Sequence, residues 1–160
     1  MSLSRRKLRV IGSHQQLYAL SCSSACIELV LKLHCQVSGS YRKIQDSYKN
    51  KNIGYGPFRG RWIRNLFFYE RSFLPPFTGL EILLSSEVRA GRFPIMSLWS
   101  GETIQGNTRF ILYHEWIVVD QVGHDFRIVS KNLRQTLDGL VMPALQKSDH
   151  TTLLLYTMLS

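Results

Sequence analysis

Residues 16–34 read QLYALSCSSACIELVLKLH, and this stretch decides the fold. Its segment Cys22–Leu33 is nearly all apolar, and the two charged residues in it, Glu28 and Lys32, are one helical turn apart. A helix with so narrow a polar stripe is surrounded by protein on almost every side. The sequence therefore predicts a buried central helix over this segment.

The rest of the chain divides into a helical half and a strand half. Further helices are expected over Tyr41–Lys49, Arg59–Glu70 and Leu80–Ala90. After Gly91 the segments become rich in β-branched and aromatic residues, which favours strands. Strands are expected over Phe93–Trp99, Arg109–Asp120, Phe126–Lys131 and Thr151–Leu159. Helices first and strands second predict an α+β domain, in which an antiparallel sheet packs on the central helix.

Length and composition exclude several classes of protein. The chain has 160 residues, a net charge of +9 and a hydrophobic fraction of 44%. This predicts a single domain over residues 1–160, with residues 1–13 as a loosely ordered basic segment. The apolar content excludes a disordered chain, and no apolar run approaches the ~18–20 residues that span a bilayer. Three cysteines argue against a disulfide framework.

The basic N-terminus does not continue as a secretory signal. The polar run Ser13, His14, Gln15 and Gln16 stands where a signal peptide has its apolar region. We therefore expect a cytoplasmic protein, or one delivered to a host or target cell by a route other than the Sec pathway.

Cys22 is the candidate nucleophile. With Ser21 as N-cap, Cys22 falls in the first turn of the predicted helix, where the helix dipole lowers the pKa of a thiol. Gln16, six residues upstream, is placed to donate to an oxyanion together with the backbone N–H of Cys22. Cys26 and Cys35 lack this position and are interpreted as bystanders. The plain alternative for Cys22 is one more buried small residue.

His114 is the candidate acid and base, at the start of a predicted strand. Gly123 and Asp125 predict a hairpin turn after that strand, which brings His114 opposite residue 132 or 133. Asn132 is then placed to orient the imidazole. Asp120, on the strand of His114, and Asp125, in the turn, are rival candidates for the third position.

The order Gln16, Cys22, His114, Asn132 resembles that of papain-like cysteine peptidases, and among them most the bacteriocin-processing, double-glycine type. The stretch from Gln16 through Cys22-Ser-Ser-Ala-Cys26 is similar to the nucleophile segment of that group. Gly91-Arg-Phe-Pro94-Ile-Met and His114-Glu-Trp-Ile-Val-Val-Asp120 are similar to two of its strands. Ser23 and Ser24 stand where the group has Gly-Pro, and Ser130-Lys131-Asn132 replaces its Asp-Pro.

The resemblance implies a papain-like fold and a hydrolase that cleaves an amide bond through Cys22, His114 and Asn132, with Gln16 in the oxyanion hole. Such an enzyme is a protease or an effector- or toxin-type enzyme that modifies proteins. A glutamine deamidase or acyl transferase with the same residues remains open, and so does a non-catalytic basic binding module. We expect a protein or peptide substrate, with acidic partners ahead of nucleic acid, and no cofactor. The spacing of the histidines indicates no metal site.

Overall fold

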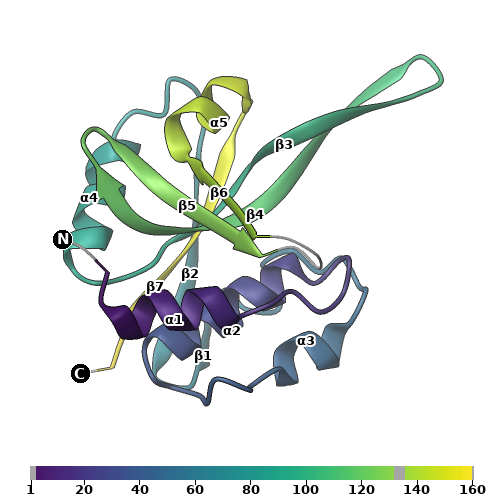
Figure 1. Cartoon of the computed structure of the whole chain (residues 1–160). Helices are drawn as coiled ribbons and strands as arrows, with labels where there is room; N and C mark the ends of the chain where they lie inside the picture. The colour runs from purple at the N-terminus through teal and green to yellow at the C-terminus, as the bar shows by residue number, and fades with distance from the viewer. Residues whose placement is uncertain (1–2, 132–135, 160) are drawn as a thin grey trace.

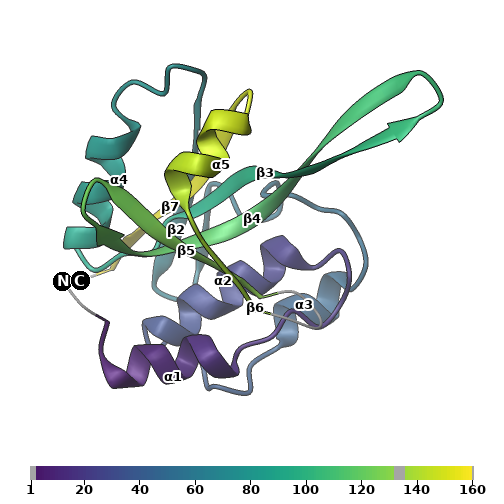
Figure 2. The same cartoon turned by 45° about the horizontal axis from the view of Figure 1, so that its top comes forward.

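The computed structural model describes residues 3–131 and 136–159 and forms helices on both faces of one sheet. Its helices are α1 (Arg5–Ser13), α2 (Cys22–Leu33), α3 (Lys43–Tyr48), α4 (Leu80–Arg89) and α5 (Val141–Lys147). Its strands are β1 (Arg61–Ile63), β2 (Leu66–Phe73), β3 (Ile95–Gln105), β4 (Thr108–Val122), β5 (Asp125–Lys131), β6 (Thr136–Leu140) and β7 (Thr151–Met158). Figures 1 and 2 show α1, α2 and α3 on one face of the sheet and α4 and α5 on the other.

The sheet is antiparallel, with the strand order β1-β2-β7-β3-β4-β5-β6. The last strand, β7, enters the middle of the sheet between β2 and β3, so the C-terminal segment joins the two halves. Beyond the sheet, β3 and β4 continue as a two-stranded arm (Figure 1). The expected combination of helices with an antiparallel sheet is confirmed. No helix among the described residues is long and apolar enough to cross a membrane.

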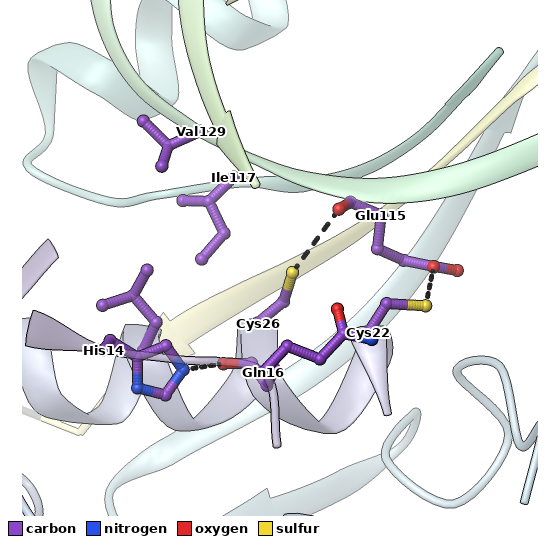
Figure 3. A pocket seen from close by; sticks show the side chains of 9 residues that line it. His14, Gln16, Cys22, Cys26, Glu115, Ile117 and Val129 are labelled. Atoms are coloured by element: carbon purple, nitrogen blue, oxygen red, sulfur yellow. Dashed lines mark hydrogen bonds between the residues drawn. The ribbon is translucent and has the colours of Figure 1, made fainter. Parts of the chain in front are cut away.

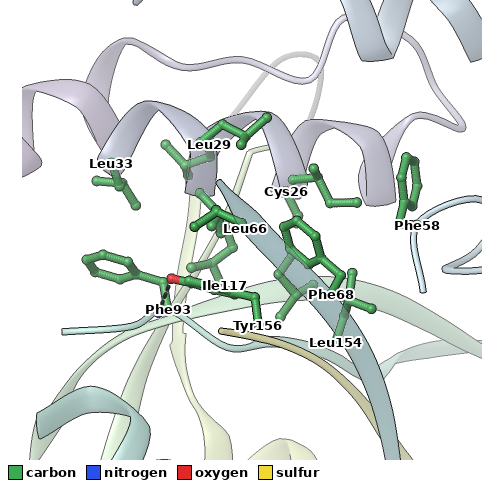
Figure 4. Packing of buried hydrophobic residues seen from close by; sticks show 14 of the residues in the cluster. Cys26, Leu29, Leu33, Phe58, Leu66, Phe68, Phe93, Ile117, Leu154 and Tyr156 are labelled. Carbon is green, nitrogen blue, oxygen red and sulfur yellow. Dashed lines mark hydrogen bonds between the residues drawn. The ribbon is translucent and has the colours of Figure 1, made fainter. Parts of the chain in front are cut away.

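Helix α2 is the buried helix that the sequence predicts. Eleven of its twelve residues are buried, and Ile27, Val30 and Leu31 are fully enclosed. Figure 4 shows its apolar side against side chains from β2, β4 and β7, which form one hydrophobic cluster with it. A second cluster joins the opposite face of the sheet to α4 and α5. The two clusters fix the sheet between two helical layers.

The predicted helix over Arg59–Glu70 is wrong, since this region forms β1 and β2. Along β2 the side chains alternate, with Leu66 and Phe68 buried and their neighbours half-buried. This period of two fits a strand that covers a core with one face. The turn between β1 and β2 holds Arg64 at a positive φ of 54°, and β2 then pairs with β7 along its whole length.

The N-terminal segment is also more ordered than predicted, because Arg5–Ser13 is helical. Ser4 caps α1 by accepting a hydrogen bond from the Lys7 backbone at 3.1 Å. Ile11 is buried in the core, and the Arg6 guanidinium donates to the Leu33 carbonyl at 2.7 Å. The basic residues therefore belong to an amphipathic helix that docks on the C-terminal end of α2.

His34 follows α2 and is expected to make folding depend on pH. Its imidazole hydrogen-bonds Tyr156 Oη at 2.6 Å. Burial, together with the positive charges of Lys7, Arg6 and Arg92, lowers its pKa from 6.5 to about 4. The unfolded chain thus binds more protons than the folded one between these values, and stability falls as the pH drops through this window.

Because His34 is partly exposed, solvent screens its charge. We therefore expect acidification to lower the free energy of unfolding by about 1–2 kcal/mol, less than the full shift of the His34 pKa would give. Urea unfolding of the wild type and of His34→Gln at a series of pH values measures it. The variant is expected to lose less stability than the wild type on acidification. Parallel curves for the two proteins would contradict the role of His34.

Candidate active site

Cys22 is the first residue of α2, as the sequence predicts. Its Sγ donates a hydrogen bond to Glu115 Oε2 at 2.6 Å (Figure 3). Ser21 occupies the N-cap position, but its hydroxyl makes no capping bond. The single hydroxyl proton is instead shared between the Tyr18 carbonyl at 2.9 Å and Gln45 Oε1 at 3.0 Å. The helix start is therefore held through the preceding loop rather than by a side-chain cap.

His114 and Glu115 lie on β4 and approach Cys22 together. The thiol sulfur, one imidazole nitrogen and one carboxylate oxygen all lie within 4.8 Å of one another. Pairing of His114 with Leu98 and of Glu115 with Ser97 on β3 sets the position of both residues along the sheet. All three residues of the cluster are half-buried, so solvent reaches them. The fold thus brings the sulfur and the imidazole into one neighbourhood.

Glu115 is the member of this cluster that the sequence does not predict. Consecutive residues of a strand point to opposite faces of the sheet. If His114 faces the site, this alternation predicts that Glu115 faces away from it. Glu115 instead shares its face with Ile117, next to α2, and reaches Cys22 from there. The signal in the sequence is a charged residue next to His114, followed by the apolar run of residues 116–119.

The electrostatics of Cys22 differ from the prediction. Burial first, and then the charge and hydrogen bond of Glu115, raise the pKa of the thiol to about 12, where the helix dipole was expected to lower it. Burial also raises the pKa of Glu115 and lowers that of His114. The resting site therefore keeps its proton on sulfur, directed at the carboxylate, with the imidazole neutral.

Gln16 lies in the same site but is engaged elsewhere. It is buried, and with Cys22, Cys26 and Glu115 it lines a cavity of about 10 Å³ (Figure 3). Its amide nitrogen donates to the carbonyls of Tyr18 at 2.8 Å and Ala19 at 3.1 Å. An oxyanion would have to replace one of these two acceptors.

A buried hydrogen-bond network holds the loop that carries Gln16. Gln45 Oε1 accepts from the Leu17 backbone at 2.7 Å and from the Ser21 hydroxyl at 3.0 Å. Its amide nitrogen donates to the Gln15 carbonyl and to Glu28 of α2 at 2.7 Å. Gln45 is 1% exposed and Glu28 fully buried. One side chain thus ties the loop before Cys22 to the helix after it.

Of the candidates for the third position, the two that the structure describes, Asp120 and Asp125, make hydrogen bonds with other residues. Asn132 lies outside the described residues. Asp120 forms an ion pair with Arg127 at 2.8 Å, and Asp125 accepts from the backbone N–H groups of Phe126 and Met142. Within the described part of the chain, the carboxylate that clusters with Cys22 and His114 is that of Glu115.

The other two cysteines are placed as the sequence suggests for bystanders. Cys26 is buried in the core around α2, with its thiol 3.8 Å from the Glu115 carbonyl. Burial raises its pKa well above the ordinary value. Cys35 is exposed, just beyond the end of α2. Cys22 is therefore the cysteine that is both next to ionisable groups and open to solvent.

Comparisons of the chain with known protein families, with curated proteins and with solved structures gave no match.

Proposed function

We propose that this chain is a papain-like thiol hydrolase that attacks an amide carbonyl with Cys22. The observation that carries the proposal is the approach of the Cys22 sulfur, the His114 imidazole and the Glu115 carboxylate to within 4.8 Å. The nucleophile stands at the start of the buried helix and the imidazole on a strand of the sheet. This arrangement agrees with the resemblance that the sequence carries.

The first step is removal of the thiol proton. Glu115 Oε2, 2.6 Å from the sulfur, is within the range of a proton acceptor, and its raised pKa strengthens it as a base. The thiolate then forms a bond to the carbonyl carbon, and the carbonyl electrons move to oxygen. At the start of α2 the backbone N–H groups have no partner within the helix, so the Cys22 N–H is placed to stabilise this oxyanion.

The second step is loss of the amine and release of the acyl group. The proton that Glu115 took from the sulfur passes through the His114 imidazole to the leaving nitrogen as the carbon–nitrogen bond breaks. Water then cleaves the thioester, and its proton returns the sulfur to the thiol. A peptide bond as substrate gives a protease. The side-chain amide of a glutamine gives a deamidase, and an amine in place of water gives a transferase. All three reactions use the same residues, so the substrate distinguishes them.

p-Nitrophenyl acetate tests the proposal without knowledge of the natural substrate. We expect release of p-nitrophenol, an acetyl group on Cys22 in mass spectra, and its loss on further incubation. Cys22→Ser is expected to abolish the acetylation, and His114→Ala to slow turnover. Cys35→Ser serves as the matched control. Acetylation that is confined to Cys35, or an acetyl-Cys22 that is as long-lived in the wild type as in His114→Ala, would contradict the proposal.

Unfolded casein distinguishes the reactions. New peptide termini indicate proteolysis, and conversion of glutamine to glutamate without chain cleavage indicates deamidation. Incorporation of an added primary amine indicates transfer. The same Cys22→Ser protein is the control for each product.

A further inference from the structure

The cluster of Cys22, His114 and Glu115 combines three kinds of metal ligand at one point. Thiolate, imidazole and carboxylate are the groups that bind Zn²⁺ in proteins, and three such groups with one open position are typical of an accessible zinc site. The donor atoms lie within 4.8 Å of one another. Tetrahedral zinc needs ligand atoms about 3–4 Å apart, given bonds of about 2.0–2.3 Å. The donor atoms would therefore have to shift by about 1 Å to bind one ion.

The surroundings of the cluster favour a cation. The thiol and the carboxylate are in contact at 2.6 Å, so loss of the thiol proton sets two negative charges side by side in a half-buried site. A divalent ion between them would neutralise both charges. The ligands come from the first residue of α2 and from two consecutive residues of β4, elements that pack on each other in the core. The fold accordingly brings the three ligands to one neighbourhood.

We propose that Cys22 Sγ, one ring nitrogen of His114 and the Glu115 carboxylate bind one Zn²⁺, and that the ion blocks the nucleophile reversibly. Bonds form from zinc to sulfur, nitrogen and oxygen, the thiol proton passes to the buffer, and no group is oxidised or reduced. Solvent occupies the fourth position. Binding of the ion is independent of catalysis, while the blocking effect rests on the proposed hydrolase function.

Cobalt substitution of the reduced protein tests the site directly. We expect one equivalent of Co²⁺ to give the visible absorption of tetrahedral cobalt and a thiolate-to-cobalt band in the near ultraviolet, both lost when Zn²⁺ is added. Cys22→Ser is expected to remove the thiolate band. His114→Ala and Glu115→Gln are expected to weaken binding by at least about tenfold, the loss that removal of even a hydrogen-bond partner of a ligand causes. Cys35→Ser and His150→Ala, which alter the exposed Cys35 and the His150–Asp149 pair, are the controls.

Absence of a thiolate band in the wild type, or a band that persists in Cys22→Ser, would overturn the proposal. Its failure is separate from that of the hydrolase. Turnover of p-nitrophenyl acetate in the presence of a chelator, without cobalt binding, refutes the metal site alone. If the protein binds cobalt in the titration but shows no turnover in the separate assay with chelator, the hydrolase alone is refuted. If the metal site and the hydrolase are both present, Zn²⁺ is expected to stop turnover and to slow alkylation of Cys22. A chelator is then expected to restore turnover and alkylation. Turnover that Zn²⁺ leaves unchanged would refute the blocking role.

Discussion

Replacing Glu115 with glutamine is expected to make Cys22 react about threefold to tenfold faster with iodoacetamide at about pH 8. The carboxylate is the largest cause of the raised thiol pKa after burial, through its charge and its hydrogen bond. Glutamine has the same shape without the charge. Each unit by which the thiol pKa falls multiplies the thiolate fraction about tenfold, and the weaker nucleophilicity of a less basic thiolate removes about half of that gain on a logarithmic scale.

Mass spectrometry of alkylated peptides measures this rate, and the exposed Cys35 in the same molecule is the internal reference. The reaction is expected to be slow in the wild type at this pH, since the pKa of Cys22 is about 12, and to accelerate as the pH rises. If Glu115 is also the proton acceptor in catalysis, the same variant loses turnover while its thiol gains reactivity. A rate for Cys22 that is unchanged or lower in Glu115→Gln would contradict the contact.

Replacing Gln45 with alanine is expected to lower the free energy of unfolding by about 2–4 kcal/mol. The substitution removes the acceptor for the Leu17 N–H and the Ser21 hydroxyl, and a donor to the buried carboxylate of Glu28. Buried polar groups that lose their partners each cost about 1–3 kcal/mol. The effect is large because a single side chain satisfies groups on the loop and on α2 at once.

Urea unfolding measures this loss, with Gln146→Ala on the exposed surface of α5 as the matched control, expected to change stability by no more than about 0.5 kcal/mol. Gln45→Glu keeps the size of the side chain but sets a second carboxylate beside Glu28. Its destabilisation is expected to shrink as the pH falls and the carboxyl groups are protonated. A loss for Gln45→Ala no larger than that of the control would show that the network does not hold the loop.

Elements with a strong apolar period could be predicted from the sequence. The bounds of α2 follow from a nearly unbroken apolar run, and β4, β5 and β7 from segments of β-branched residues. The segment Arg59–Glu70 could not, because its short alternation of Leu66 and Phe68 becomes decisive only when β7 pairs beside it. Helix α1 was missed for a similar reason, since its apolar side becomes visible only against α2.

For the candidate site, the order of residues predicted two of its members and their elements. Cys22 and His114 were expected at a helix start and on a strand, and they lie there, with sulfur and imidazole within 4.8 Å. The direction of the thiol pKa was predicted wrongly, because a helix dipole is a local feature of the sequence whereas burial and the Glu115 charge are not. The position of Gln16 in the cavity was predicted, but not the engagement of its amide by Tyr18 and Ala19.

The sequence by itself determined the buried helix, the antiparallel sheet and the identity of one cysteine that stands apart from the other two. These depend on local patterns of apolar residues and on the position of a residue within its element. Only the tertiary structure decided what surrounds that cysteine. Cys22 and Glu115 are 93 residues apart in the chain, and they meet because α2 packs on β4. Burial and this contact together keep the proton on the sulfur, and no spacing in the sequence encodes either of them.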